Sequence, residues 1–580
     1  MRGRDLVLAL FLALALRWSA VGHGLPHYAY VPDNHVVKAA LGMARDMDLT
    51  APSGTYTSYP YLMPYMLLPI YGAWYGTGRL QGDWSSTAEF GGHLLEDPST
   101  AYFMARWLVV AFALLLVAGV GRLTAHVGST RAAGLAACLA ATALMPWQFS
   151  LMARPWVPLT ALGVWALERA FQARMTGRTR TWLAAGALAG LSAACHQAGL
   201  LFGPLVGLVL LMPAGERAAT RKLAGAGASA LGFLAAAVVL GYPFWLVHGG
   251  LSGGGPGQET AVAVGGQGIR WQFGGARAWV LARSLFGYDP MLVLLGIGGF
   301  VLSRREEKGR ELRTALSWCA GLWIALFLAY SGAHVRYLLP GVMLMVPLAG
   351  IAGARWADRK GAHGRRVLAV ILLVPVVQAA RAANVMVRSD NRTEAAYWIA
   401  GELRFVNPGA LVAVEGGDLP LQASAMSLQR QVDDGLSLSM REGRRLAQGG
   451  EGLNLLPLEK YFFDARGGSR TDYGSLAEGV AEPEGAEGES LISRFLNSKR
   501  PKLVVLMDDA PDGQRDDPLA LWLRSPNPTG LPWGRRLRVW PVTEDWTGEA
   551  HLPRDMEFPL TALWGTARPG PRVELWATGL

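Results

Sequence analysis

The sequence predicts a polytopic α-helical membrane protein with about eleven transmembrane helices, followed by a small extracytoplasmic α/β domain. Hydrophobic residues make up 51% of the 580-residue chain and charged residues only 17%, where a soluble protein carries about a quarter. The apolar runs end near Ala383, and the rest has the composition of a soluble domain. We therefore expect a membrane domain over residues 1–384 and an extramembrane domain over residues 385–580.

The first expected membrane helix covers residues 6–21, after Arg2 and Arg4. A cleaved signal peptide is the alternative interpretation. Arg17 within the run and the lack of a small-residue cleavage site favour a retained helix. Positive charge before the helix predicts a cytoplasmic N-terminus, which puts residues 23–64 on the outer side.

Residues 61–78 are apolar but contain Pro64 and Pro69, and we expect them to lie in the outer interface without crossing. Ten further apolar runs are expected to cross: 103–124, 132–149, 157–171, 182–194, 199–212, 223–247, 278–302, 315–330, 338–354 and 367–383.

Arginine and lysine gather in alternate loops, at 122–131, 174–180, 217–222, 304–313 and 355–366. The other loops are far poorer in these residues, apart from the long first loop. This asymmetry predicts cytoplasmic Arg-rich loops and a C-terminal domain on the periplasmic or extracellular side. The Arg, Ala and Gly bias is typical of GC-rich bacteria, so the expected location is a bacterial inner (cytoplasmic) membrane, with the lipid bilayer as a partner.

The formal net charge of +10 does not indicate nucleic-acid binding, because the arginines lie in short loops between apolar spans. Cys138, Cys195 and Cys319 each lie in an apolar run without CxxC spacing, so neither disulfides nor a thiolate metal site is expected.

Two further regions have recognisable patterns. Residues 251–268 are glycine-rich, but no strand precedes them and no GKS or GKT follows, so a mobile loop over a cavity is favoured over a phosphate cradle. In the C-terminal domain, residues 393–403 are expected to form a helix, and residues 410–414 and 502–507 buried strands. Residues 467–489, rich in Gly and Glu, are expected to form a loop.

Asp33 is the leading catalytic candidate, because it follows the first apolar run directly. A carboxylate near hydrocarbon usually serves a site or a water-filled cavity, where it can accept a proton from an attacking hydroxyl. The alternative is that Asp33 caps the helix expected from Val36 onward. Asp46 and Asp48 have DxD spacing, but the sequence after Asp48 favours a turn, and no metal site is predicted.

Several basic residues of the outer face are candidates for binding a phosphate. Arg336 lies at the mouth of an apolar run, where it either binds phosphate or extends to the interface. His196 lies where two short spans meet, and helix packing is an equal alternative there. The full candidate set is Arg336, His334, His196, Arg106 and Lys38, with Arg154 as a further outer cation. HExxH, GxSxG and Walker patterns are absent from the sequence, which disfavours metalloproteases, serine hydrolases and ATP-driven transporters.

Four features resemble integral-membrane GT-C glycosyltransferases of the protein mannosyltransferase, aminoarabinose transferase and Rgt-like groups. They are the first-loop acid in Pro32-Asp33, the Tyr59-Pro60 element, Arg336–Pro340 (RYLLP), and the Asp390–Ile399 helix after the last span. The resemblance covers roughly residues 1–410. It implies a GT-C-like membrane domain that transfers a sugar from a polyprenyl-phosphate donor to an extracytoplasmic lipid, polysaccharide or protein acceptor, with inversion. Asp33 would then be the general base, and the outer cations would hold the phosphate.

The sequence departs from that pattern at two positions. Many relatives have Glu after the first-loop Asp, where Asn34 stands here, and many have an acid where Trp156 stands. A second carboxylate and a divalent metal are therefore not predicted, and no cofactor is implied beyond the donor. A non-catalytic lipid or polysaccharide transporter, or a scaffold on the same fold, is the alternative, although the internal symmetry typical of transporters is absent from the sequence.

Overall fold

A computed structural model describes residues 3–25, 34–49, 60–212, 219–247, 251–253, 262–264, 267–269, 274–275, 278–303, 310–330, 333–388, 391–406, 409–415, 421–463, 491–508, 519, 523, 532, 534–540 and 572–578. The chain divides into two compact units. The first contains Met1–Gly22, Val31–Ser86 and Thr100–Asn384, and the second contains His23–Tyr30, Thr87–Ser99 and Val385–Leu580.

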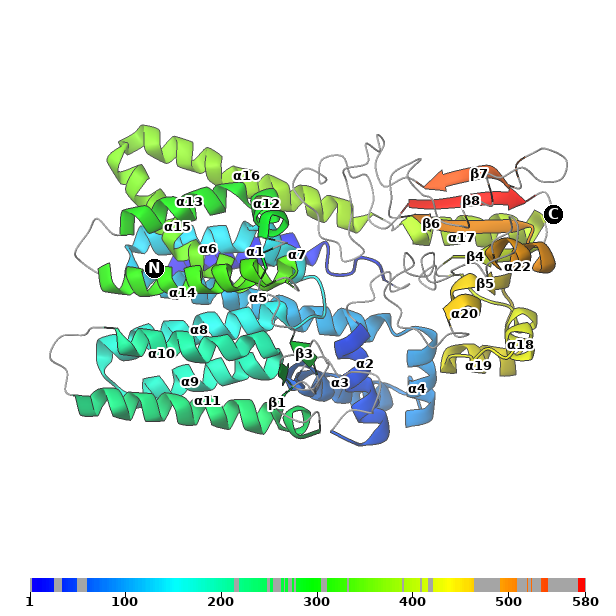
Figure 1. Cartoon of the computed structure of the whole chain (residues 1–580), viewed down its shortest axis with the longest axis horizontal. Coiled ribbons are helices and arrows are strands. Elements are labelled where there is room, and N and C mark those ends of the chain that lie inside the picture. The colour runs from blue at the N-terminus through cyan, green and yellow to red at the C-terminus, as the bar shows by residue number, and fades with distance from the viewer. Residues whose placement is uncertain are drawn as a thin grey trace. The chain divides into compact units, whose positions relative to one another are not determined.

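The first unit is a helical bundle whose longer helices run side by side (Figure 1). Its helices in chain order are α1 (Gly3–Trp18), α2 (Asn34–Asp46), α3 (Leu62–Gln81), α5 (Ser99–Val127), α6 (Thr130–Thr142), α7 (Leu144–Phe149), α8 (Trp156–Thr176), α9 (Thr179–Cys195), the 3₁₀ helix η2 (Gln197–Leu201), α10 (Phe202–Leu211), α11 (Ala219–Val247), α12 (Ala278–Tyr288), α13 (Pro290–Ser303), α14 (Arg310–Ala329), the 3₁₀ helix η3 (Val335–Leu338), α15 (Leu339–Arg359) and α16 (Gly361–Val387).

Small residues let the bundle helices approach closely. α9 packs against α8 on one side and α11 on the other, and α15 packs against α6, α13 and α14. A methyl group added at Gly186 of α9 would overlap the Ser229 carbonyl oxygen, and one at Gly190 would overlap that of Phe233. Gly186 and Gly190 are four residues apart on one face, the spacing typical of close helix contacts in membranes.

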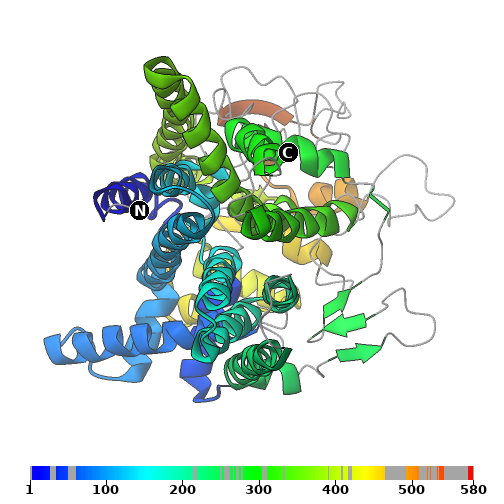
Figure 2. The ribbon, with the colours of Figure 1, turned by 90° about the vertical axis from the view of Figure 1, so that its left-hand side faces the viewer.

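The described residues confirm a multi-pass helical protein but not a count of eleven spans. Within the described part of the chain, five helices are long and apolar enough to cross a membrane, or six if α12 and α13 form one broken span. Several expected spans are shorter than the roughly 20 residues that a bilayer requires, such as α6 with 13 residues and α10 with 10 residues. α3, which was expected to lie in the interface, runs across the direction of the bundle helices in Figure 2, which looks along the bundle.

Two expected spans are broken into pairs of helices. Residues 278–302, expected as one span, form α12 and α13, which bend by 105° at Asp289. Residues 132–149 divide at Ala143 into α6 and α7. One side chain stabilises both breaks, because the Asp289 carboxylate accepts hydrogen bonds from the first backbone N–H groups of α7, Leu144 N at 2.8 Å and Met145 N at 3.2 Å.

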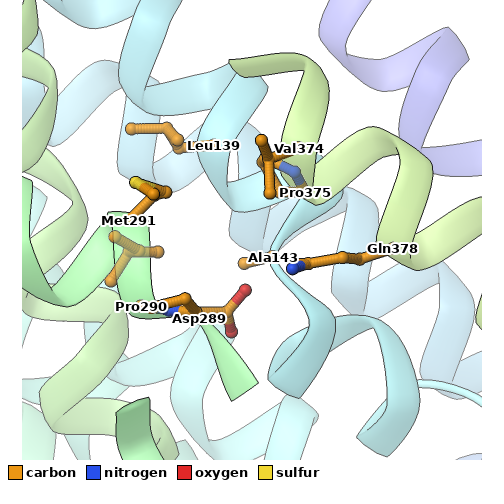
Figure 3. A pocket seen from close by; sticks show the side chains of 9 residues that line it. Leu139, Ala143, Asp289, Pro290, Met291, Val374, Pro375 and Gln378 are labelled. Atoms are coloured by element: carbon orange, nitrogen blue, oxygen red, sulfur yellow. The ribbon is translucent and has the colours of Figure 1, made fainter. Parts of the chain in front are cut away.

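A small cavity lies beside this double break. Figure 3 shows the Asp289 carboxylate and the Gln378 amide pointing into the same space, below Ala143. The other lining residues are apolar: Leu139, Pro290, Met291, Leu292, Val374 and Pro375.

The second unit contains a five-stranded mixed sheet with the order β5-β4-β6-β8-β7. β4 pairs in parallel with β5 and β6, whereas β8 pairs antiparallel with β6 and β7. Its elements are α4 (Thr87–Glu96), α17 (Asn391–Val406), β4 (Leu411–Val414), α18 (Ala425–Asp433), α19 (Met440–Ala447), β5 (Asn454–Pro457), α20 (Leu458–Phe463), α22 (Leu491–Lys499), β6 (Leu503–Asp508), β7 (Gly534–Trp540) and β8 (Arg572–Thr578).

Apolar side chains cover both faces of this sheet. Ile399 of α17 packs on one face with Val412 and Val505, and Leu496 of α22 packs on the other with Val504. The alternation along β6 follows from the two-residue period of a strand. The predicted helix at 393–403 and strands at 410–414 and 502–507 are confirmed as α17, β4 and β6.

The glycine-rich segment contains a second, three-stranded antiparallel sheet. Its strands are β1 (Leu251–Gly253), β2 (Val262–Val264) and β3 (Gln267–Ile269). The rest of residues 251–268, and the predicted loop at 467–489, lie outside the described residues.

Candidate functional site

The leading catalytic candidate, Asp33, lies outside the described residues. The described chain resumes at Asn34, the first residue of α2, directly after it. On α2, Val36, Val37, Ala39 and Ala40 are buried. The roles of Asp33 as a base or as a helix cap therefore both stay predictions.

The other side of α2 carries positive charge. Desolvation by the surrounding protein, followed by the charges of Arg154 and Lys38, lowers the pKa of His35. Lys38 is one turn after His35 on α2, whereas Arg154 comes from the connection between α7 and α8. The fold therefore brings Arg154 close to α2, the helix that follows the first loop.

The connection that carries Arg154 is held in place by buried side chains of α1. Arg17, which is fully buried, donates from Nε to Ser150 Oγ at 2.7 Å and from Nη1 to the Ala141 carbonyl oxygen at 3.1 Å. Trp147 Nε1 donates to the Leu16 carbonyl oxygen at 2.9 Å. Asp289 also binds the backbone N–H groups at the start of α7. The segment before Arg154 is therefore held at the start of α7 and again at Ser150.

An aromatic and cationic cluster surrounds the start of α8. The Trp156 ring lies 4.2 Å from His196 and 4.6 Å from Tyr337, measured between ring centroids. Tyr337, from η3, also stacks with His334 at 6.2 Å, and the Arg336 guanidinium lies 5.9 Å from its ring centre. Trp323 of α14 donates from Nε1 to the Tyr337 carbonyl oxygen at 2.8 Å, which fixes the position of η3.

His196 is held neutral in this cluster. It is 4% exposed, and its Nδ1 accepts a hydrogen bond from Ala198 N at 3.0 Å. Burial, followed by the charge of Arg336, lowers the pKa of His196 to about 3. With Nδ1 engaged as an acceptor, the proton of the neutral ring is on Nε2, which can only donate.

We expect this histidine to make stability depend on pH. Below its ordinary pKa of 6.5, the unfolded chain protonates His196 while the folded chain does not, so stability falls as the pH drops from 6.5 towards 3. One such group lowers stability by about 2 kcal/mol between pH 7.5 and pH 5. Thermal unfolding of purified protein at both pH values, for wild type and His196→Gln, measures the difference.

The His196→Gln variant keeps an acceptor for Ala198 N and should lose less stability in acid than the wild type. His363→Gln, at an exposed position of α16, is the matched control and should follow the wild type. Equal acid sensitivity of the wild type and His196→Gln would contradict the prediction.

The structure thus brings most of the predicted cations together around residues 154–156. His35, Lys38 and Arg154 form one group, and His196, His334 and Arg336 form the other around Tyr337 and Trp156. Arg106 is placed differently, because it is 1% exposed and donates from Nη1 to the Val21 carbonyl oxygen at 3.0 Å. Its phosphate-binding role stays a prediction.

Sequence reasoning did not select Tyr337, Trp156 or His35 as members of the site. Tyr337 lies within the RYLLP segment and Trp156 replaces the acid of the relatives, so the sequence contained a signal for both. His35 is two residues after Asp33, so its position beside the catalytic candidate was the only signal for it in the sequence.

The DxD pair, Asp46 and Asp48, lies at the end of α2 and in the residues that follow it. Asp46 accepts hydrogen bonds from Arg45 at 2.6 and 2.8 Å. Met47 has φ 52° and Asp48 N donates to the Met43 carbonyl oxygen, so the helical path of α2 ends before Asp48. Residues 50–52 of the predicted turn lie outside the described residues. No group of three or more His, Cys, Asp or Glu side chains that could hold a metal ion is present in the described part of the chain.

The solved structures to which the chain is similar are membrane glycosyltransferases, the class that the sequence resembles. ArnT from Cupriavidus metallidurans bound to undecaprenyl phosphate matches at 14% identity, with 69% of this chain and 73% of that chain covered and a TM-score of 0.46. The oligosaccharyltransferase AglB from Archaeoglobus fulgidus, in complex with an inhibitory peptide and a dolichol-phosphate, matches at 14% identity, with 87% and 69% covered and a TM-score of 0.46.

The mycobacterial arabinofuranosyltransferase AftD matches at 15% identity over 100% of this chain and 42% of that chain, with a TM-score of 0.43. The sequence matches no known family model and no curated protein.

Proposed function

We propose that this protein is an inverting membrane glycosyltransferase that uses a polyprenyl-phosphate sugar as donor. The observation that supports it is the gathering of His35, Lys38, Arg154, His196 and Arg336 around the start of α8. These residues come from four separate parts of the chain. Burial, followed by the charges of Arg154 and Lys38 at His35 and of Arg336 at His196, lowers the pKa values of the two histidines, as expected next to positive charge. A positive field next to an apolar bundle suits a lipid phosphate, whose tail needs hydrocarbon and whose headgroup needs cations.

The proposed chemistry assigns a role to each part of the site. The acceptor hydroxyl attacks the anomeric carbon while Asp33 takes its proton, and the bond from that carbon to the phosphate oxygen breaks. Arg336, with Lys38 and Arg154, stabilises the negative charge that develops on the leaving phosphate. Neutral His196 donates a hydrogen bond from Nε2 to a phosphate oxygen, and attack opposite the leaving group inverts the configuration.

We also propose that the protein lies in a bacterial inner membrane with the site on the outer side. The N-terminus and the Arg-rich loops would be cytoplasmic, and the sheet of the second unit would be periplasmic or extracellular. A reporter that is active only outside the cytoplasm, fused after Leu580, should be active. Activity of a cytoplasm-only reporter at the same position would overturn this orientation.

Binding of undecaprenyl phosphate by the purified protein tests the proposed function. We expect saturable binding of undecaprenyl phosphate and none of undecaprenol, which has the same tail without the phosphate, because the cations recognise the phosphate. Sugar transfer from undecaprenyl-phosphate-linked sugars then tests catalysis. Binding of undecaprenyl phosphate without sugar transfer from any donor would favour the lipid transporter or scaffold. Equal binding of undecaprenyl phosphate and undecaprenol would overturn the phosphate site.

A further inference from the structure

A second cationic site lies on α5 and α8, far from the start of α8. Two guanidinium groups lie near the Trp165 ring, that of Arg122 at 5.5 Å and that of Arg169 at 5.6 Å from the ring centre. α5 and α8 run side by side within the bundle (Figure 1). Arg169 is thirteen residues after Trp156, which corresponds to about 20 Å along α8. This arrangement is therefore separate from the site around Tyr337.

A buried carboxylate orders both arginines. Glu168 is fully buried, and its oxygens lie 3.2 Å from Arg122 Nε, from Arg169 Nε and from His126 Nε2. Two guanidinium groups face one carboxylate, so the group carries a net positive charge whatever the protonation of His126.

Arg122 has donors left for a ligand. Its side chain is 47% exposed, and only its Nε is engaged by the described protein. Arg169 uses Nη1 for Gln172 Oε1 at 2.6 Å and is 32% exposed. The Nη1 and Nη2 groups of Arg122 form a planar pair of the kind that binds phosphate at two oxygens.

An apolar strip continues from the arginines along the same face. Leu115 is 48% exposed and lies seven residues, or two turns, before Arg122. Trp165 Nε1 donates to the Leu115 carbonyl oxygen at 2.9 Å, which fixes the Nε1 edge of the ring against α5. Gly119 makes this possible, since a methyl group there would lie 2.9 Å from Trp165 Nε1.

We propose that Arg122, Trp165 and Arg169 form a headgroup site for an anionic phospholipid. The lipid phosphate accepts hydrogen bonds from the Nη groups of Arg122, and an acyl chain packs along Leu115 and Trp165. The ligand has to be amphipathic, because the two arginines and the apolar strip of Leu115 and Trp165 lie next to each other on one face. The site does not depend on the proposed glycosyltransferase activity.

Retention of lipid by the purified protein in detergent, measured by native mass spectrometry, tests the proposal. The probes are phosphatidylglycerol and phosphatidylcholine with identical acyl chains. The wild type should bind phosphatidylglycerol about tenfold more tightly than phosphatidylcholine. Both lipids carry the phosphate, but the choline of phosphatidylcholine adds a positive charge beside two arginines, each of which favours an anionic headgroup by roughly 1 kcal/mol.

The variant Arg122→Gln/Glu168→Gln/Arg169→Gln removes both arginines without leaving a buried carboxylate alone, and it should lose this preference. Trp165→Leu keeps every charge and should weaken both lipids alike. The matched control is Arg131→Gln. Arg131 lies at the start of α6, the helix that follows α5, and it already pairs with Asp358 of α15. Unchanged preference in the triple variant with an unchanged melting temperature, or equal loss in Arg131→Gln, would overturn the site.

Discussion

Asp33→Asn should lower the rate of sugar transfer by about 10²–10⁴-fold, the usual effect of removing a general base. An amide has the shape of the carboxylate but cannot accept a proton near neutral pH, and the adjacent Asn34 cannot substitute for the same reason. The measurement is single-turnover transfer from a polyprenyl-phosphate sugar by purified wild type and variant, at matched expression and melting temperature.

Asn caps a helix about as well as Asp, so the capping alternative for Asp33 predicts an active variant. Asp46→Asn is the matched control, because Asp46 lies at the end of α2 and its carboxylate is bound by Arg45. We expect nearly full activity from Asp46→Asn. Full activity of Asp33→Asn would assign Asp33 to capping.

Arg336→Ala should weaken the binding of undecaprenyl phosphate by about 1.5–3 kcal/mol, or about 10–150-fold, because a charge-assisted hydrogen bond is lost. The position of Arg336 supports this expectation: its guanidinium lies 5.9 Å from the Tyr337 ring centre, and its charge lowers the pKa of His196. The dissociation constant of undecaprenyl phosphate, measured in detergent for both proteins, tests it.

Arg336→Lys retains the charge without the planar pair of donors, so it should bind with intermediate affinity. Arg45→Ala removes a cation that already pairs with Asp46, and it should bind the lipid as the wild type does. If Arg336→Ala folds and keeps its affinity, then Arg336 extends to the membrane interface and does not hold the phosphate.

The sequence determined the elements that depend on local composition. Long apolar runs predicted the membrane helices, and short continuous apolar runs predicted β4 and β6 as buried strands. These predictions succeed because hydropathy and period are properties of neighbouring residues. The number of spans was harder to predict, because apolar helices such as α6 and α10 are too short to cross a membrane alone.

The tertiary structure alone decided the breaks within apolar runs. The bend at Asp289 and the division at Ala143 depend on one carboxylate that accepts hydrogen bonds from Leu144 N and Met145 N, 145 and 144 residues away in the sequence. Averaged hydropathy does not register such a bond. Arg17 in the first run was visible as an unusual charge, but its acceptors, Ser150 Oγ and the Ala141 carbonyl oxygen, were not.

The candidate site shows the same division. The residue types and the outer-face assignment of Arg336, His334, His196 and Lys38 came from sequence, because basic residues beside apolar runs are conspicuous. Their grouping came from the fold, which places Trp156 against both His196 and Tyr337 and brings Arg154 to His35. The separations between these pairs exceed any local period, and the free energy that closes them comes from helix packing, which a single sequence does not display.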